Sequence, residues 1–295
     1  MTHYLADWIA NETNQSMSVE RWNDLVNHFD VEALAEQIHS VGVGYYQISI
    51  GQNSGYYLAP NPTYDRLVGI HPSKCSRRDL VFDLYEALQK RGIRLMVYLP
   101  SGAPADDAAA VDALGWRHGP DRNREFQIKW QQVIEDWSRR WGEKISGWWF
   151  DGVYWPNAMY RSCQPPNFTS FAAAARAGNP KSAVAFNPGV YHRIFSPSPH
   201  GDYTAGEMDL PERIRIAHAE NGLVDGAQIY ILSHLGEKWG MGAPRFSTED
   251  VVAWTRKVAS QNGVFTWDTP VQTNGQISKA FMDQLTEIGR GVGQG

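Results

Sequence analysis

The chain has few cysteines, no long apolar stretch and no excess of basic residues, and each absence excludes a class of protein. Cys75 and Cys163 are the only cysteines among 295 residues, which argues against a disulfide framework and against a CxxC-type zinc site. No apolar run approaches the roughly eighteen residues that a membrane helix needs. The net charge is −5 without a Lys/Arg-rich stripe, so we expect neither a membrane nor a nucleic acid as partner.

The start of the chain and its histidines exclude two further classes. Residues 1–8 lack the basic start and apolar core of a signal peptide, so the default expectation is a cytoplasmic protein, or a secreted or periplasmic one if a leader has been removed. The nine histidines are dispersed, with no HxH or HExxH spacing, which disfavours a metal-dependent hydrolase. We therefore expect no metal and no cofactor. The sequence predicts no particular oligomeric state.

Apolar periodicity predicts alternating helices and strands along the whole chain. Helical spacing with terminal Gly or cap residues predicts helices at 31–41, 77–91, 126–141, 168–177, 248–259 and 279–289. Short apolar runs predict strands at 3–5, 45–50, 93–99, 147–151, 183–186, 203–204, 227–232 and 264–267. Eight strands, most of them separated by a helix, predict one (β/α)8 barrel over residues 1–295, with irregular helices in its second half.

Polar residues follow the predicted strands, where a parallel barrel gathers its catalytic side chains. These strand-end residues are His3, Gln52, Asn53, Pro100, Ser101, Asp151, Asn187, Glu207, His234 and Asp268. The segment WWFDG is the most informative among them, because an apolar strand ends there abruptly in Asp151 and is followed by Tyr154 and Trp155. A carboxylate beside aromatic rings is typical of a sugar site, although Asp151 could also simply cap the next turn.

Hydrolysis of a glycosidic bond requires two carboxyl groups, one ionised and one with a raised pKa. We predict Asp151 as the nucleophile and Glu207 as the general acid/base, with Glu237 as the alternative acid/base. No metal takes part in such a mechanism. The predicted partner is therefore a carbohydrate substrate.

The chain resembles the α-L-fucosidases of glycoside hydrolase family 29 from its start almost to its end. His3-Tyr4 is similar to the family's HWG segment, 29–46 to its FDAxxWAxLAKxAGAKY segment, and WWFDG to its WFDG, which carries the nucleophile. Asn187-Pro188 resembles the family's NP pair, 202–207 its DFxTPE, Trp239-Gly240 its WGY, and 263–290 its closing strand and helix. The resemblance implies a retaining exo-glycosidase barrel that lacks the family's usual C-terminal β-sandwich.

The departures from the family pattern concern the sugar subsite. The family's KHHDGF is replaced by 51–56, GQNSGY, so that Gln52 and Asn53 stand where the family has two histidines. Asp268 occupies the position of an asparagine, and AGE replaces TPE before the acid/base. Amides bind hydroxyls without carrying charge, so fucose or a related sugar is the expected substrate. The resemblance implies hydroxyl contacts from His3, Gln52, Asn53 and Asn187.

Stacking surface for the sugar is expected from Tyr56, Trp155, Trp239 and Trp267, each of which could also be ordinary core. Two alternatives remain open from the sequence. One is a glycosidase with a different sugar specificity, because the family's histidine pair is missing. The other is a barrel that binds carbohydrate without cleaving it.

Overall fold

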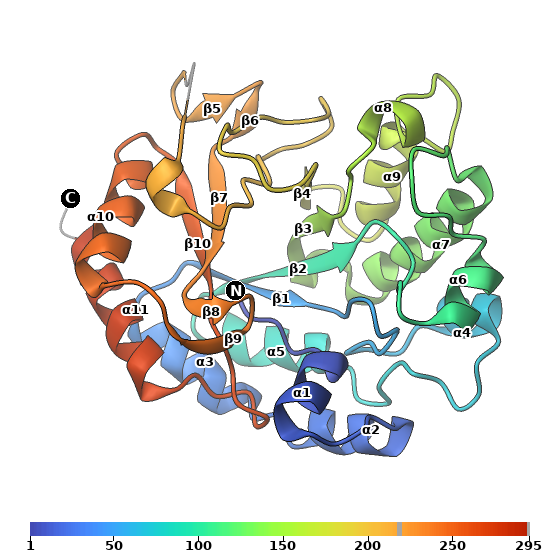
Figure 1. Cartoon of the computed structure of the whole chain (residues 1–295), viewed down its shortest axis with the longest axis horizontal. Helices are drawn as coiled ribbons and strands as arrows, with labels where there is room; N and C mark the ends of the chain where they lie inside the picture. The colour runs from blue at the N-terminus through green and yellow to red at the C-terminus, as the bar shows by residue number, and fades with distance from the viewer. Residues whose placement is uncertain (217–219, 294–295) are drawn as a thin grey trace.

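Two groups of parallel strands lie at the centre of the computed structural model, which describes residues 1–216 and 220–293 (Figure 1). The first group is a four-stranded sheet in the order β1-β2-β3-β4, with β1 (Tyr45–Ser49), β2 (Arg94–Pro100), β3 (Ile145–Asp151) and β4 (Ala183–Phe186). The second is a pair formed by β7 (Tyr230–His234) and β10 (Val264–Asp268). All neighbours within each group are parallel, so the carboxyl ends of the strands lie together at one edge of each group.

Irregular segments, rather than the two remaining predicted strands, lie between these groups. Thr2 makes a single bridge to β1, while the backbone oxygen of Met1 accepts from Thr269 just beyond β10 at 2.9 Å. On the other side, the Asp202 N–H donates to Val184 of β4 at 2.8 Å, and Glu207 bridges to Leu232 of β7.

The predicted strands 3–5 and 203–204 were therefore wrong as regular strands. Helix α1 (Ala6–Thr13) begins directly after the first, and Gly206 takes a left-handed conformation with φ 55° just after the second. Both features end an extended backbone. The described residues form a mixed α/β fold with parallel strands, but not a closed ring of eight regular strands.

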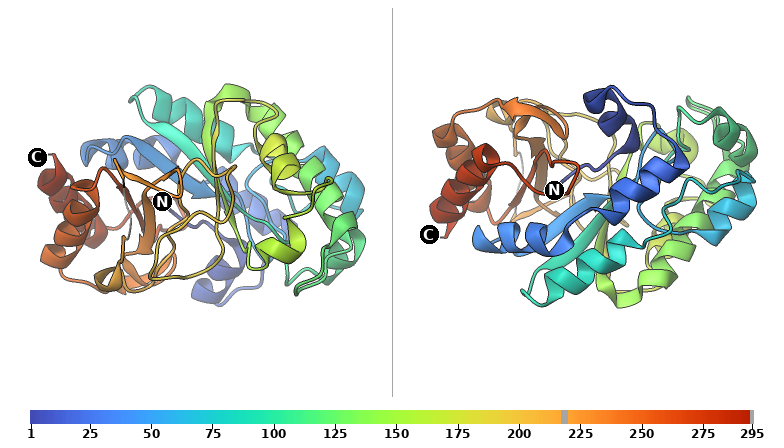
Figure 2. Two further views of the ribbon diagram at one scale, coloured as in Figure 1. Left: turned by 90° about the horizontal axis from the view of Figure 1, so that it is seen from above. Right: turned by 90° about the horizontal axis from the view of Figure 1, so that it is seen from below.

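Helices cover the outer side of the strands (Figures 1 and 2). The six predicted helices are present as α3 (Val31–Ser40), α5 (Leu80–Gln89), α7 (Arg124–Trp141), α9 (Phe168–Ala175), α10 (Thr248–Ala259) and α11 (Lys279–Val292). Helix α5 begins three residues later than predicted because the Asp79 carboxylate accepts a hydrogen bond from the Phe82 N–H and caps the helix there.

The structure also contains shorter elements, of which β6 alone lies within a predicted strand, that of residues 227–232. They are α1, α2 (Val19–Asn27), α4 (Pro62–Val68), α6 (Ala108–Leu114), α8 (Pro156–Met159), the 3₁₀ turns η1 (Gly142–Lys144) and η2 (Pro211–Arg213), and the hairpins of β5 (Leu223–Val224) with β6 (Ala227–Gln228) and β8 (Gly236–Lys238) with β9 (Met241–Pro244). Among the described residues between β4 and β7, the only helical element is η2. This agrees with the predicted irregular helices in the second half of the chain. No helix of residues 1–216 or 220–293 is long and apolar enough to cross a membrane.

Much of the aromatic content is core, and α7 carries its centre. The Trp137 ring is fully buried, stacks on Trp141 at 6.0 Å and packs against Tyr57 at 5.2 Å. Its indole N–H donates to the backbone oxygen of Pro60 at 3.1 Å, just before α4. Trp137 thus joins α7 to the loop after β1.

Replacing this ring tests the core. We expect Trp137→Ala to lower the free energy of unfolding by about 3–5 kcal/mol, because a large cavity opens and the indole hydrogen bond is lost. Ile128→Ala is the matched control, since Ile128 lies on the same helix and is 37% exposed. We expect it to change the free energy of unfolding by about 0.5 kcal/mol. Urea unfolding followed by fluorescence measures both, and equal effects would contradict the assignment of Trp137 to the core.

Candidate active site

Asp151 ends β3 with its carboxylate on the inner side of the sheet, surrounded by three donors. The Tyr98 hydroxyl donates to Oδ2 at 2.6 Å, the Gly152 N–H to Oδ1 at 2.7 Å, and the Asn187 amide to Oδ1 at 2.8 Å. Strand alternation explains the direction, because Trp149 points inward with Asp151 and stacks on Tyr98, whereas Phe150 points outward against α9. Hydrogen bonds to a carboxylate stabilise its negative charge.

Asn187 joins Asp151 to the second carboxyl group. Its side chain is fully buried, and the same amide nitrogen that bonds Asp151 also donates to Oε2 of Glu207. The amide oxygen accepts from the Gly189 N–H at 3.1 Å, which fixes the orientation of the amide. Because both acceptor oxygens bond the same nitrogen, Oδ1 of Asp151 and Oε2 of Glu207 lie within about 6 Å of each other.

Glu207 reaches this position because its backbone lies tightly against β7. The Leu232 N–H donates to the Gly206 oxygen at 3.0 Å, and a Cβ at Gly206 would stand 1.9 Å from the backbone oxygen of Tyr230. Burial and, second, the charge of Asp151 raise the pKa of Glu207 to about 8. At neutral pH Glu207 is therefore mostly protonated, next to a carboxylate held by three donors.

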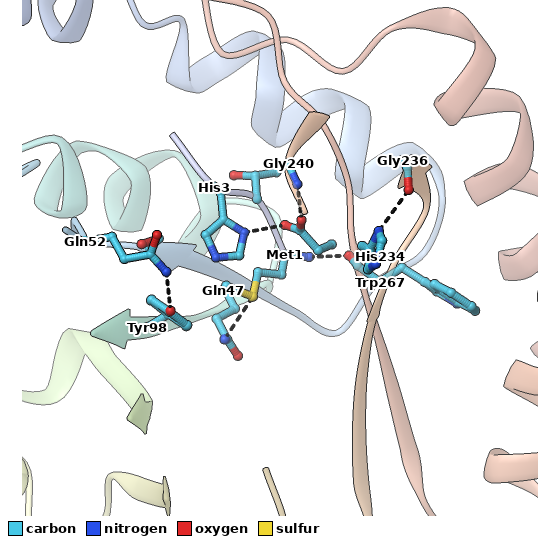
Figure 3. A network of polar contacts seen from close by, with 12 residues as sticks. Met1, His3, Gln47, Gln52, Tyr98, His234, Gly236, Gly240 and Trp267 are labelled. Carbon is cyan, nitrogen blue, oxygen red and sulfur yellow. Dashed lines mark hydrogen bonds and ion pairs between the residues drawn. The ribbon is translucent and has the colours of Figure 1, made fainter. Parts of the chain in front are cut away.

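Gln52 and Tyr98 begin a chain of hydrogen bonds (Figure 3). The chain ends on Asp151, which accepts from the Tyr98 hydroxyl. The Gln52 amide N–H donates to the Tyr98 hydroxyl at 2.6 Å, so the hydroxyl's own proton is directed at Asp151. Burial and then the charge of Asp151 hold the pKa of Tyr98 well above its ordinary value, which keeps that proton in place. Gln52, predicted to bind the sugar, thus orients a tyrosine through its amide. Asn53 beside it is exposed.

Tyr98 was missed in the sequence, although a signal for it exists. It lies two residues before Pro100, which pairs with Asp151 in the register of β2 and β3, so alternation places Tyr98 on the inner side. An inward-facing polar ring one pair before a strand-end carboxylate is the pattern to search for. The sequence inventory considered only residues at the strand ends themselves.

His3 lies next to Tyr98 (Figure 3). The centres of the two rings are 5.1 Å apart. Its Nδ1 is 2.9 Å from Oδ1 of Asp268, a fully buried carboxylate whose Oδ2 also accepts from the Gly240 N–H at 2.6 Å. Because a carboxylate oxygen accepts, Nδ1 carries the hydrogen and Nε2 is left for other partners. The Trp239 ring packs against the His3 ring, with 6.2 Å between their centres. His3 and Trp239, both predicted as site residues, therefore lie side by side.

His234, at the end of β7, completes the polar wall. Its Nδ1 is 2.8 Å from the backbone oxygen of Gly236, so this nitrogen carries the hydrogen, and its ring lies 4.6 Å from Trp239. Burial and then the charge of Arg245 lower the pKa of His234. The ring is therefore neutral at pH 7, and its Nε2 lies 3.6 Å from Oδ1 of Asp209.

Four other expected residues form no hydrogen bond with either carboxylate among the described residues. Trp267 points outward from β10, stacks on Phe265 at 4.2 Å and donates to Thr255 of α10, because Asp268 takes the inward position. Tyr56 packs against Trp22 and lies 5.3 Å from the Lys74 ammonium. Trp155 packs against His118 at 4.9 Å, and Glu237 is exposed on β8. Trp267 and Tyr56 thus both make packing contacts within the protein.

Tyr154, in contrast, borders the carboxylates and is 48% exposed. The charge of Asp151, ahead of burial and the charge of Glu207, raises its pKa. Residues 1–216 and 220–293 contain no group of three His, Cys, Asp or Glu side chains placed to hold a metal ion. The described site therefore consists of two carboxyl groups, amides, imidazoles and aromatic rings.

Paired carboxyls at the strand ends of a parallel α/β fold are characteristic of glycoside hydrolases. The chain belongs to the α-L-fucosidase family, whose model matches residues 11–293. It is a glycoside hydrolase of that family. No curated protein matches its sequence.

Solved structures show the same fold at low sequence identity. An endo-fucoidan hydrolase of glycoside hydrolase family 107 is 16% identical with a TM-score of 0.71, over 91% of this chain and 86% of that one. A family 29 α-L-fucosidase from Bacteroides thetaiotaomicron is 15% identical with a TM-score of 0.60, over 96% and 65%. Isoenzyme 1 of Paenibacillus thiaminolyticus α-L-fucosidase is 18% identical with a TM-score of 0.59, over 89% and 62%. The chain spans less than two thirds of these two fucosidases.

A first prediction concerns the close approach at Gly206. We expect Gly206→Ala to lower kcat/KM on an aryl α-L-fucoside by about 100-fold or more, because the added methyl displaces Glu207 from Asn187. Gly69→Ala is the control, since Gly69 also has a positive φ of 72° but nothing lies within 4 Å of its Cβ. Both variants carry backbone strain, so equal activity losses would contradict the proposed role of the contact.

A second prediction follows from the raised pKa of Glu207. Between its ordinary value of 4.5 and about 8, the folded chain holds a proton that the unfolded chain has lost, so this group lowers stability as pH rises through that window. We expect Glu207→Gln to gain stability over the wild type between pH 5 and pH 8, on the order of 3 kcal/mol. Glu237→Gln, at an exposed position, is the control and should show no such trend in urea unfolding.

Proposed function

We propose that this chain hydrolyses α-L-fucosides with retention of anomeric configuration, Asp151 acting as nucleophile and Glu207 as general acid and then base. The observation that carries the proposal is the Asn187 amide, which holds both carboxyl groups at once. A separation within about 6 Å fits the roughly 5–5.5 Å of retaining pairs better than the roughly 6.5–9.5 Å of inverting pairs. Glu237, the alternative acid/base, has no such link to Asp151.

The two protonation states suit the first step. Asp151 is held by three donors and attacks the anomeric carbon, while Glu207, protonated at neutral pH, gives its proton to the leaving oxygen. Once Asp151 is esterified its charge is gone, and one cause of the raised pKa of Glu207 disappears with it. The ionised Glu207 then takes a proton from the attacking water.

The sugar subsite is proposed to lie between Asp151 and the His3, His234 and Trp239 side chains. Nε2 of His3 remains for a hydroxyl group, Nε2 of His234 lies beside the Asp209 carboxylate at 3.6 Å, and Trp239 supplies an apolar face. The imidazoles of His3 and His234 would thus take the place of the family's histidine pair, which is absent after β1. Fucose follows from family membership, and the exposed Asn53 is proposed to contact the sugar from the rim.

The fold that supports this site is proposed to be a (β/α)8 barrel whose first and sixth positions are irregular. Residues 1–3 lie between β1 and β10, and residues 202–207 lie between β4 and β7, each tied to its neighbours by backbone hydrogen bonds. His3 and Glu207 come from these two segments. An irregular backbone there gives their side chains directions that a regular strand would not allow.

Release of a terminal fucose is the proposed mode of action, and internal cleavage is the second candidate. Two half-exposed rings, Tyr154 and Tyr191, continue from the carboxylates along the surface and favour a substrate longer than one sugar. Product size decides between the modes. Terminal release yields free fucose from the first turnover, whereas internal cleavage of a fucose polymer yields oligosaccharides first.

The nucleophile assignment is tested with azide. We expect Asp151→Ala to lose turnover of an aryl α-L-fucoside by about 10⁴-fold or more, and azide to restore part of it by attacking from the space that the carboxylate leaves. The product should be a fucosyl azide of inverted anomeric configuration, identified by NMR. Asp202→Ala, at an exposed carboxylate paired with Arg176, is the control. This variant should turn over the fucoside at the wild-type rate in the absence of azide.

Failure of the wild type on aryl fucosides and on fucose-containing oligosaccharides, together with unchanged sugar binding in Asp151→Asn, would contradict hydrolysis. That result would favour a carbohydrate-binding barrel. Turnover of another aryl glycoside in place of the fucoside would leave the two carboxylates assigned and correct the sugar.

A further inference from the structure

A cavity of about 670 Å³ lies beside the site described above, between the segment after β4 and the turn η2. It is lined by His192, Arg193, Glu212, Arg213, Ile214 and Arg215. The two segments are joined through their backbones, because the Arg215 N–H donates to the His192 oxygen at 3.0 Å and Arg193 bridges to Arg215. This pairing turns Ile194 and Ile214 into the core and leaves the arginines outward.

The charge of this cavity is opposite to that of the protein. Three arginines and His192 face one carboxylate, that of Glu212, in a chain whose net charge is −5. Among residues 1–216 and 220–293, none of the three guanidinium groups forms an ion pair or a side-chain hydrogen bond. The Lys257 ammonium adds a further cation, 3.5 Å from the backbone oxygen of Ile214. Within the described part of the chain, the donors of each guanidinium group are therefore available to an anion.

The cavity is close to the catalytic pair. Asn187 precedes His192 by five residues, and Glu207 precedes Glu212 by five, so each side of the cavity lies at most about 17 Å from one of these site residues. Tyr154 and Tyr191 flank Gly189 in between: a Cβ there would be 3.4 Å from the first ring and 3.6 Å from the second. A surface of exposed rings therefore leads from the carboxylates toward the arginines.

We propose that this cavity binds an anionic substituent, a sulfate ester or a carboxylate, on a saccharide chain that extends from the reacting sugar over Tyr154 and Tyr191. The inference rests on the proposed function and names the substrate class of that site. Guanidinium groups bind planar or tetrahedral oxyanions through paired N–H donors, and rings stack on the apolar faces of sugars. Three cations around one cavity repel one another, and a bound anion relieves that repulsion.

The test compares one neutral ligand with two anionic ligands, one carrying sulfate esters and one carrying carboxylates. Calorimetry measures binding of a sulfated fuco-tetrasaccharide, its desulfated form and an oligogalacturonate of the same length to the whole chain carrying Asp151→Asn, which prevents turnover. We expect at least one anionic ligand to bind about tenfold or more tighter than the neutral one. The preferred anion identifies the substituent as sulfate or carboxylate.

Two matched double variants locate the effect. In the Asp151→Asn chain, Arg193→Gln with Arg215→Gln should abolish the preference for the anionic ligand. Arg139→Gln with Arg290→Gln removes the same charge from arginines that pair with Glu135 and Glu287 on α7 and α11, and should leave the preference unchanged. Equal binding of all three ligands, or equal loss in both double variants, would overturn the proposal.

Turnover separates this inference from the proposed function. With Asp151 intact, Arg193→Gln with Arg215→Gln should keep the wild-type kcat/KM on a neutral aryl α-L-fucoside. Turnover of that fucoside without any preference for anionic ligands would overturn only the subsite. A preference that persists without fucoside turnover would support the subsite and contradict only the proposed function.

Discussion

The site depends on one buried amide. Asn187 donates from a single nitrogen to Asp151 and to Glu207, and a backbone N–H holds its oxygen, so the two carboxyls cannot separate without breaking a buried hydrogen bond. Keeping them this close has an electrostatic consequence, because burial and Asp151 together raise the pKa of Glu207 to about 8. The same constraint that brings the two carboxyl groups together therefore keeps Glu207 mostly protonated at neutral pH, beside an Asp151 carboxyl group that accepts three hydrogen bonds.

The surrounding residues act on this pair through directed hydrogen bonds. Gln52 donates to Tyr98, which commits the tyrosine's proton to Asp151, and Asp268 fixes the hydrogen of His3 on Nδ1. Both arrangements follow from residues that differ from the family pattern. An amide in place of a histidine and a carboxylate in place of an asparagine thus alter the wall of the site, while the two carboxyl groups of Asp151 and Glu207 are retained.

Apolar periodicity in the sequence was sufficient to predict the long helices and the strands of the two parallel groups. All six predicted helices exist, and Asp151 lies at the end of its strand as WWFDG indicates. The two short strands failed, because 3–5 and 203–204 have too few residues to show alternation and their backbones are set by neighbours distant in the chain. Trp267 was assigned to the site by proximity to a strand end, yet alternation with Asp268 turns it toward α10.

What the sequence by itself determined is the family, the order of the elements and the identity of the strand-end carboxylates, since these depend on local pattern. Only the tertiary structure decided that Asn187 connects Asp151 with Glu207 rather than Glu237, that Tyr98 belongs to the site, and that Arg193 and Arg215 face one cavity. Each of those facts joins residues from different strands or loops. Their distances are set by how the layers pack, and no local spacing along the chain encodes them.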